Sequence, residues 1–79
     1  MASLAHDPGL KKPLSARETE VLTMASTGLR NAEIADRLCI SIHAVKFHLA
    51  TIYRKLGVTN RTEAAVVFLR STGEHGAEG

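Results

Sequence analysis

The clearest pattern in this chain lies in the stretch SIHAVKFHLATIYRKL, residues 41–56. On a helical wheel of about 100° per residue, one narrow arc collects Val45, Leu49, Ile52 and Leu56. The opposite side carries His43, Lys46, Phe47, Ala50, Thr51 and Arg54. The pattern predicts an amphipathic helix over about 42–55 that packs on one side and presents the other to a partner or to solvent.

The basic residues of this region are not balanced by acidic ones. Between Asp36 and Glu63 the chain has no carboxylate, but it has Arg37, Lys46, Arg54, Lys55 and Arg61. The overall charge is only +2, so this interval concentrates a local charge of +5. A basic surface of this kind favours a partner that carries phosphate groups. The alternative is that these cations only keep a helix face solvated.

The length of the chain limits what it can be. Seventy-nine residues allow one small domain that buries about 60% of its unfolded surface. A hydrophobic content of 44% with 23% charged residues is ordinary for a globular fold. The size leaves little room for an enclosed active site, and we find no glycine-rich phosphate loop and no nucleophile beside a base. We therefore expect that the chain is not an enzyme.

Cysteine and histidine usage argues against disulfides and metal sites. Cys39 is the single cysteine, which is typical of a reducing compartment. His43 and His48 are about 140° out of phase on a helix, which does not suit a pair of metal ligands. The N-terminus lacks an apolar signal segment, and the longest apolar run, 64–69, is too short to cross a bilayer. We expect a cytoplasmic protein with no cofactor and no membrane contact.

Two shorter helices are predicted before the central one. Ser15 and Glu18 form a capping-box pattern, in which each side chain can accept a hydrogen bond from the exposed backbone N–H of the other residue. This helix should run to about Thr27 and stop at Gly28. A second helix over 31–38 has barely two turns and needs its neighbours to be stable. Its inward side chains should be Ile34, Ala35 and Leu38.

A fourth helix follows the central one. Asn60 and Glu63 repeat the capping-box pattern, and the helix should run to about Arg70. Its apolar residues, 64–69, point all round the helical wheel, so one face needs a second buried surface beyond the core. A symmetric second copy is the simplest partner. We expect residues 1–13 to be a flexible leader and 71–79 a flexible tail around a domain at 14–70.

Several segments at fixed spacing resemble a known family. They are LSARETEVL (14–22), Gly28, EIADRL (33–38), AVKFH (44–48) and KLGVTNR (55–61). Together residues 14–69 resemble the LuxR-type (GerE-like) helix-turn-helix domain, which is also the output module of NarL/FixJ-type response regulators. The resemblance implies an all-α, four-helix domain that binds duplex DNA as a homodimer and regulates transcription.

The resemblance also assigns roles to positions on the central helix. In this family that helix enters the major groove, and Lys46, Phe47 and Ala50 stand at the positions that approach bases. Arg54 lies farther along the same side, and Thr51 is better placed for a phosphate. His43 belongs to the same outward side.

Further contacts are expected at helix ends and on the last helix. The N-termini at Ser41 and Asn60 can offer backbone N–H groups to phosphates, and Arg61 is a candidate phosphate ligand. Capping alone is the alternative role of Ser41 and Asn60. In the family the last helix, here about 61–70, joins two protomers. The candidate interface residues are therefore Val66, Val67, Leu69 and Arg70.

Three positions depart from the family pattern. Arg30 stands where a serine or threonine cap is usual, so we assign the cap to Asn31. Ala44 replaces a threonine and removes one hydroxyl from the start of the central helix. Cys39 stands at a turn position that commonly holds glycine. If the backbone there is left-handed, the β-carbon of the cysteine destabilises the fold by about 1–2 kcal/mol.

Phe47 is the most informative exposed residue of the pattern. A phenyl ring directed at solvent is unfavourable unless it meets a partner, and a thymine methyl group in the major groove is one such partner. Packing beside the first helix or beside a linker is the alternative.

Two other functions stay open at this point. One is a sigma-factor type of promoter-reading domain, whose partner would be RNA polymerase. The other is a helical protein-interaction module, in which the apolar last helix docks a protein and the basic face is incidental.

Overall fold

The computed structural model describes residues 13–78, with side chains described through Ser71. Over that range it has four helices and no strand: α2 (Ala16–Ser26), α3 (Asn31–Leu38), α4 (Ile42–Leu56) and α5 (Arg61–Glu78). The predicted all-α, four-helix architecture is confirmed. The leader expected over 1–13 lies outside the described residues except for Pro13.

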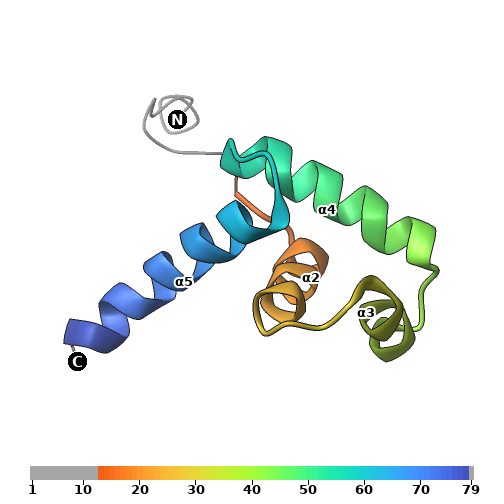
Figure 1. Cartoon of the computed structure of the whole chain (residues 1–79), viewed down its shortest axis with the longest axis horizontal. Helices are drawn as coiled ribbons and strands as arrows, with labels where there is room; N and C mark the ends of the chain where they lie inside the picture. The colour runs from red at the N-terminus through yellow and green to blue at the C-terminus, as the bar shows by residue number, and fades with distance from the viewer. Residues whose placement is uncertain (1–12, 79) are drawn as a thin grey trace.

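Helices α2 and α4 hold the domain together. α2 packs against the other three helices, and α4 packs against α3 and α5 as well. Within the described range α3 and α5 do not pack on each other. Figure 1 shows α4 crossing above α2 and α3, while α5 leads away from them toward the C-terminus. The side of α4 that faces away from α2 and α3 is therefore left uncovered.

All four helices contribute to one apolar core. The buried residues are Val21, Leu22 and Ala25 of α2, Ile34 and Ala35 of α3, Val45, Leu49 and Ile52 of α4, and Ala64 of α5. Leu38 and Leu56 are half-buried against it. The core is thus built from the residues that the helical periods select, and the α4 arc predicted from the sequence is its largest contribution.

The start of α2 has the predicted capping box. The Ser15 hydroxyl accepts the Glu18 N–H at 3.1 Å, and the Glu18 carboxylate accepts the Ser15 N–H at 2.9 Å. The helix ends at Ser26 with Thr27 as its C-cap, and Gly28 follows with a φ of 97°. Only glycine adopts that backbone at low cost, so the predicted stop is confirmed.

The prediction that Asn31 caps α3 is wrong. The capping position is Arg30, and its N–H donates to the Glu33 carboxylate at 2.7 Å. The arginine side chain cannot accept a hydrogen bond, so the helix start is satisfied from within by a residue one turn along. Asn31 becomes the first helical residue, and its side-chain oxygen is used elsewhere.

The turn from α3 to α4 runs through a strained residue. Cys39 is the only non-glycine residue with positive φ among those described, at φ 57° and ψ 44°. The Ile40 N–H donates to the Ala35 carbonyl at 3.0 Å, which closes the end of α3. The Ser41 hydroxyl then accepts the Ala44 N–H at 3.0 Å and caps α4 as predicted. The left-handed backbone considered for Cys39 is confirmed.

The predicted end of the last helix is wrong. The helix starts at Arg61 but continues past Arg70 to Glu78. The tail was expected to begin at Ser71 because of its glycines. Glycine lowers helix propensity by about 1 kcal/mol relative to alanine without forbidding the helix, and no proline lies beyond Pro13 to remove a backbone donor.

A glycine at position 39 tests whether the left-handed backbone between α3 and α4 is strained. Cys39→Gly should raise the free energy of unfolding by up to about 1 kcal/mol, because the left-handed β-carbon penalty exceeds the entropic cost of glycine. Urea unfolding followed by circular dichroism measures the change. Cys39→Ala keeps a β-carbon and should give no comparable gain, and equal stabilisation by both variants would contradict the strain.

Candidate nucleic-acid interface

The outward side of α4 forms a continuous exposed strip. Five of its residues are exposed: His43, Lys46, Phe47, Ala50 and Arg54. Thr51 lies at the margin of the strip and is half-buried. The strip therefore brings together the six α4 residues that the sequence proposed for contact with DNA, and it does so on a helix whose other side is fixed in the core.

Phe47 stands out within the strip because 66% of its surface is exposed. The alternative that it packs beside the first helix does not hold, since it is absent from the core and from the residues packed against it. Its ring contacts His48 edge to face, with ring centroids 5.9 Å apart. His48 itself is half-buried.

The turn between α4 and α5 is built by Asn60 and Glu63. The Asn60 side-chain oxygen accepts the Glu63 N–H at 2.9 Å, so Asn60 caps α5 as predicted. The Glu63 carboxylate bonds to Thr59 instead of Asn60. It accepts the Thr59 N–H at 2.8 Å and the Thr59 hydroxyl at 3.0 Å. These two hydrogen bonds, of which the one from the backbone N–H has the larger effect, hold the pKa of Glu63 below its usual range. Its negative charge is thus directed at the turn.

Arg61 has a structural role that the sequence did not indicate. Its guanidinium donates to the Asn31 side-chain oxygen at 3.1 Å and to the Leu29 carbonyl. The residue is half-buried and links the start of α5 to the loop before α3. A phosphate contact by Arg61 stays a prediction, and it would have to use the donors that these bonds leave over.

Lys55 and Glu18 form an ion pair between the end of α4 and the start of α2. The Lys55 ammonium donates to the Glu18 carboxylate at 2.8 Å and to the Pro13 carbonyl at 3.3 Å. Glu18 is only 7% exposed. Its predicted capping role is confirmed. Lys55 is engaged within the fold and does not stand free on the basic face.

The Glu18 carboxylate is stabilised in its charged form. The Lys55 ammonium, followed by the Ser15 N–H, holds the pKa of Glu18 below its ordinary value of 4.5. One side chain thus closes the capping box of α2 and ties down the end of α4. Sequence reasoning missed the pair because its residues are 37 positions apart and belong to separate motifs.

Helix α5 exposes apolar residues on the side away from the core. Val66, Val67 and Leu69 are 48%, 37% and 52% exposed, and Arg70 is exposed beside them. The buried side is supplied by Ala64, with Phe68 packed against the core. A hollow of about 380 Å³ adjoins the exposed valines and is lined also by Gly57, Val58, Thr62 and Glu63.

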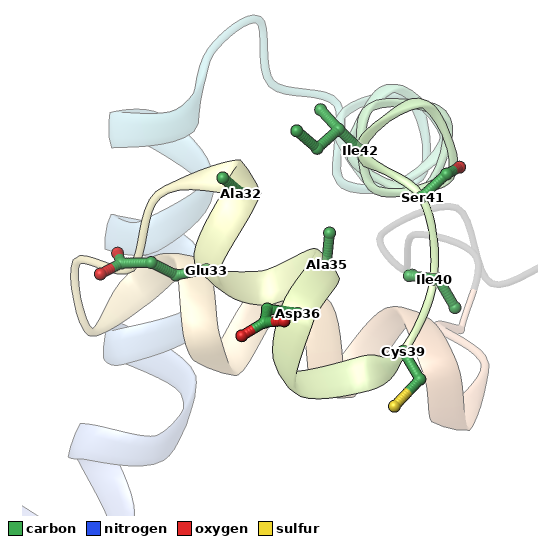
Figure 2. A pocket seen from close by; sticks show the side chains of 8 residues that line it. All are labelled: Ala32, Glu33, Ala35, Asp36, Cys39, Ile40, Ser41 and Ile42. Atoms are coloured by element: carbon green, nitrogen blue, oxygen red, sulfur yellow. The ribbon is translucent and has the colours of Figure 1, made fainter.

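A second hollow lies between α3 and the start of α4 (Figure 2). Its volume is about 590 Å³, and it is lined by Ala32, Glu33, Ala35, Asp36, Cys39, Ile40, Ser41 and Ile42. Figure 2 shows the carboxylates of Glu33 and Asp36 along α3 and the Ile42 side chain at the start of α4. This acidic wall lies on the α3 side, outside the basic interval that begins at Arg37.

The described part of the chain has neither a metal-binding cluster nor a membrane-spanning helix. Residues 13–71 contain no group of three or more histidine, cysteine or acidic side chains that could hold a metal ion. No helix within the described range is long and apolar enough to cross a membrane.

The helix-turn-helix arrangement of α3 and α4, with an exposed basic strip on the second helix, agrees with one family. Residues 12–68 match the description of the bacterial regulatory proteins of the luxR family (GerE). The chain belongs to the luxR family. Its proteins are regulators of transcription, so the matched domain is of a DNA-binding, regulatory type.

Named relatives and a solved structure agree with this membership. One relative is YhjB of Escherichia coli strain K12, which is named as an HTH-type transcriptional regulator. It is 52% identical over 56 residues, which are 71% of this chain and 28% of that protein. Response regulator RamR of Streptomyces coelicolor is 48% identical over 56 residues, with the same shares. The DNA-binding domain of the response regulator ComA, crystallised with the anti-activator RapF, gives a TM-score of 0.68 at 38% identity over 70% of this chain and 95% of that one.

YhjB and RamR are much longer than this chain. The chain spans 28% of the length of YhjB and of RamR. The comparison therefore concerns one domain of such regulators.

Removal of the Glu18 charge should destabilise the domain in a pH-dependent way. Glu18→Gln should lower the free energy of unfolding by about 1–3 kcal/mol at pH 7, because a charge-assisted hydrogen bond is lost. A carboxyl with a lowered pKa in the fold stabilises it above the unfolded pKa, and this contribution disappears as the pH falls through the folded pKa. The difference from the wild type should therefore shrink below pH 4.5. Urea unfolding across pH measures it.

Glu20→Gln provides the matched control on the same helix. Its partner Arg17 is 3.6 Å away and both side chains are largely exposed, so the change should stay within about 0.5 kcal/mol at every pH. Equal effects of the two variants would contradict the special role of Glu18.

Proposed function

We propose that this chain binds duplex DNA sequence-specifically as a homodimer and thereby regulates transcription. In this proposal α4 lies in the major groove, α3 braces it from behind, and α5 joins two protomers. The observation that carries the proposal is the exposed strip on α4, a row of basic, aromatic and small side chains on a helix with a fully packed opposite side.

The shape and charge of the strip suit the major groove. The groove admits one helix and displays a distinct pattern of donors and acceptors for each base pair. Lys46 and Arg54 can donate to base edges or phosphates, and Ala50 lets the helix approach closely. The strip lies inside an interval, 37–62, that contains no carboxylate, so no acidic side chain of α4 itself opposes its approach to the DNA phosphates.

Both ends of α4 carry groups suited to phosphates. Ser41 begins the helix and Asn60 begins α5 just beyond its other end. α4 has fifteen residues and is therefore about 22 Å long. Backbone N–H groups at both N-termini can receive phosphates on the two sides of a groove. Thr51 and the donors that remain on Arg61 can add further contacts.

The dimer part of the proposal depends on α5. Exposed apolar residues on one helix face favour burial against a second copy, and a closed twofold arrangement uses the same patch twice. The patch consists of Val66, Val67 and Leu69 with Arg70 at its edge. Two α4 helices would then read half-sites about one helical turn apart on an operator of approximate twofold symmetry.

Lys46→Ala is the first test of base readout. It should weaken specific binding by about 1–3 kcal/mol and reduce the preference for the best duplex over random DNA. Fluorescence anisotropy with selected and random duplexes measures both. Binding of the wild type should also fall with salt by about 0.9 log units per log unit of salt for each phosphate neutralised.

Arg17→Ala is the control, because it removes an equal charge from α2, outside the strip. It should leave the preference between duplexes unchanged. A folded dimer that shows no salt-sensitive DNA binding would contradict the proposal and favour a protein-interaction module. Binding that appears only when RNA polymerase is added would favour a sigma-type function.

Val67→Glu tests the role of α5. Burial of an unpaired carboxylate in the dimer contact should raise the dimer dissociation constant at least about tenfold, equivalent to about 1.4 kcal/mol. Sedimentation equilibrium measures association, and circular dichroism should report unchanged helix content. Thr19→Glu places the same charge on the exposed side of α2 and should leave association intact. Loss of the fold in Val67→Glu would place that residue in the core instead.

A further inference from the structure

The exposed phenyl ring of Phe47 is the one large apolar side chain in the middle of a basic strip. It is 66% exposed, more than any other large hydrophobic residue described. A helix that only needed contact with phosphates would gain from a polar residue there. An aromatic ring at this position indicates that the partner presents an apolar group between its charges.

The ring is held in place from one side. The His48 ring contacts it edge to face at 5.9 Å between centroids, at an interplanar angle of 64°, and His48 itself is half-buried. Such a contact limits the motion of the phenyl ring and adds to its stability. Ala50, three residues later, is exposed as well and has a short side chain. Phe47 thus presents a positioned and largely exposed ring.

The position of the ring places it among the groups that approach DNA. On the helical wheel Phe47 lies about 20° from Arg54, about 40° from His43 and about 60° from Ala50. The rise from Lys46 to Ala50 is about 6 Å, which corresponds to about two base-pair steps. The groups around the ring are cationic or neutral, and no carboxylate lies between 37 and 62. The occupant that fits is an apolar group flanked by phosphates.

We propose that Phe47 reads the 5-methyl groups of thymine in the major groove, so that the DNA half-site contains thymine within two to three base pairs of the position read by Lys46. Thymine is the only DNA base that carries a methyl group on its major-groove edge, beside an O4 acceptor. Phenyl against methyl is an apolar contact, while Lys46 takes an acceptor such as guanine N7 or O6. This inference rests on the proposed function and names the bases that the α4 strip selects.

The test removes the methyl group and nothing else. Duplexes with a random core of 20 base pairs are selected on the intact chain, and the best duplex then receives uracil for thymine at one position at a time. Uracil keeps every hydrogen-bonding group of thymine and lacks only the 5-methyl. At one or two positions of each half-site, wild-type affinity should fall about fourfold per methyl, equivalent to about 0.8 kcal/mol.

The Phe47→Ala variant should bind the thymine and uracil duplexes equally well, with an affinity near that of the wild type for uracil. Ile42→Ala is the matched control. It truncates another exposed apolar residue of α4, 43% exposed, that lies about 140° away from Phe47 on the wheel. It should retain the full difference between thymine and uracil.

The outcomes separate the inference from the function on which it rests. A selected duplex that binds with strong salt dependence but equally with thymine or uracil at every position would overturn the methyl readout and leave DNA recognition standing. A thymine preference that survives in Phe47→Ala would assign the contact to another residue and overturn the role of Phe47. A selection that enriches no duplex would overturn DNA recognition itself.

Discussion

The ion pair between Glu18 and Lys55 ties the end of α4 to the start of α2. The carboxylate is almost fully buried and accepts hydrogen bonds from the Ser15 N–H and from the Lys55 ammonium. One group therefore fixes the start of α2 and the end of α4 together. The ammonium also donates to the Pro13 carbonyl, so the chain that enters the domain is held at the same point. The ion pair thus adds a polar contact at the edge of a small core, in which the described helices bury nine apolar residues.

Given this anchor, the remaining contacts orient α4 along its length. Val45, Leu49 and Ile52 fix which side faces the core, and the Ser41 cap fixes where the helix begins. The strained turn at Cys39 sets the angle between α3 and α4. These constraints all act on the buried side or at the ends of α4, which leaves its outer strip free of structural roles.

The basic surface is smaller than the sequence suggests. Of the five cations between 37 and 62, Lys55 is committed to Glu18, and Arg61 donates to the Leu29 carbonyl and to Asn31. Lys46 and Arg54 are the basic residues left on the strip. Recognition by so few charges gives more weight to the shape and apolar character of the strip, which is why the exposure of Phe47 matters for function.

The sequence by itself determined the four helices, the core residues of α4, the cap at Ser41 and the exposure of Phe47, because helical periodicity and capping are local properties of the chain. It also determined the family, through motifs at fixed spacing. Only the tertiary structure decided the partners of Glu18, Lys55 and Arg61, since those contacts join residues 30 or more positions apart. The cap of α3 and the end of α5 at Glu78 are local features that the sequence pattern nevertheless misplaced. Helix propensity leaves such local choices nearly balanced in free energy, whereas the long-range contacts depend on how the helices pack together.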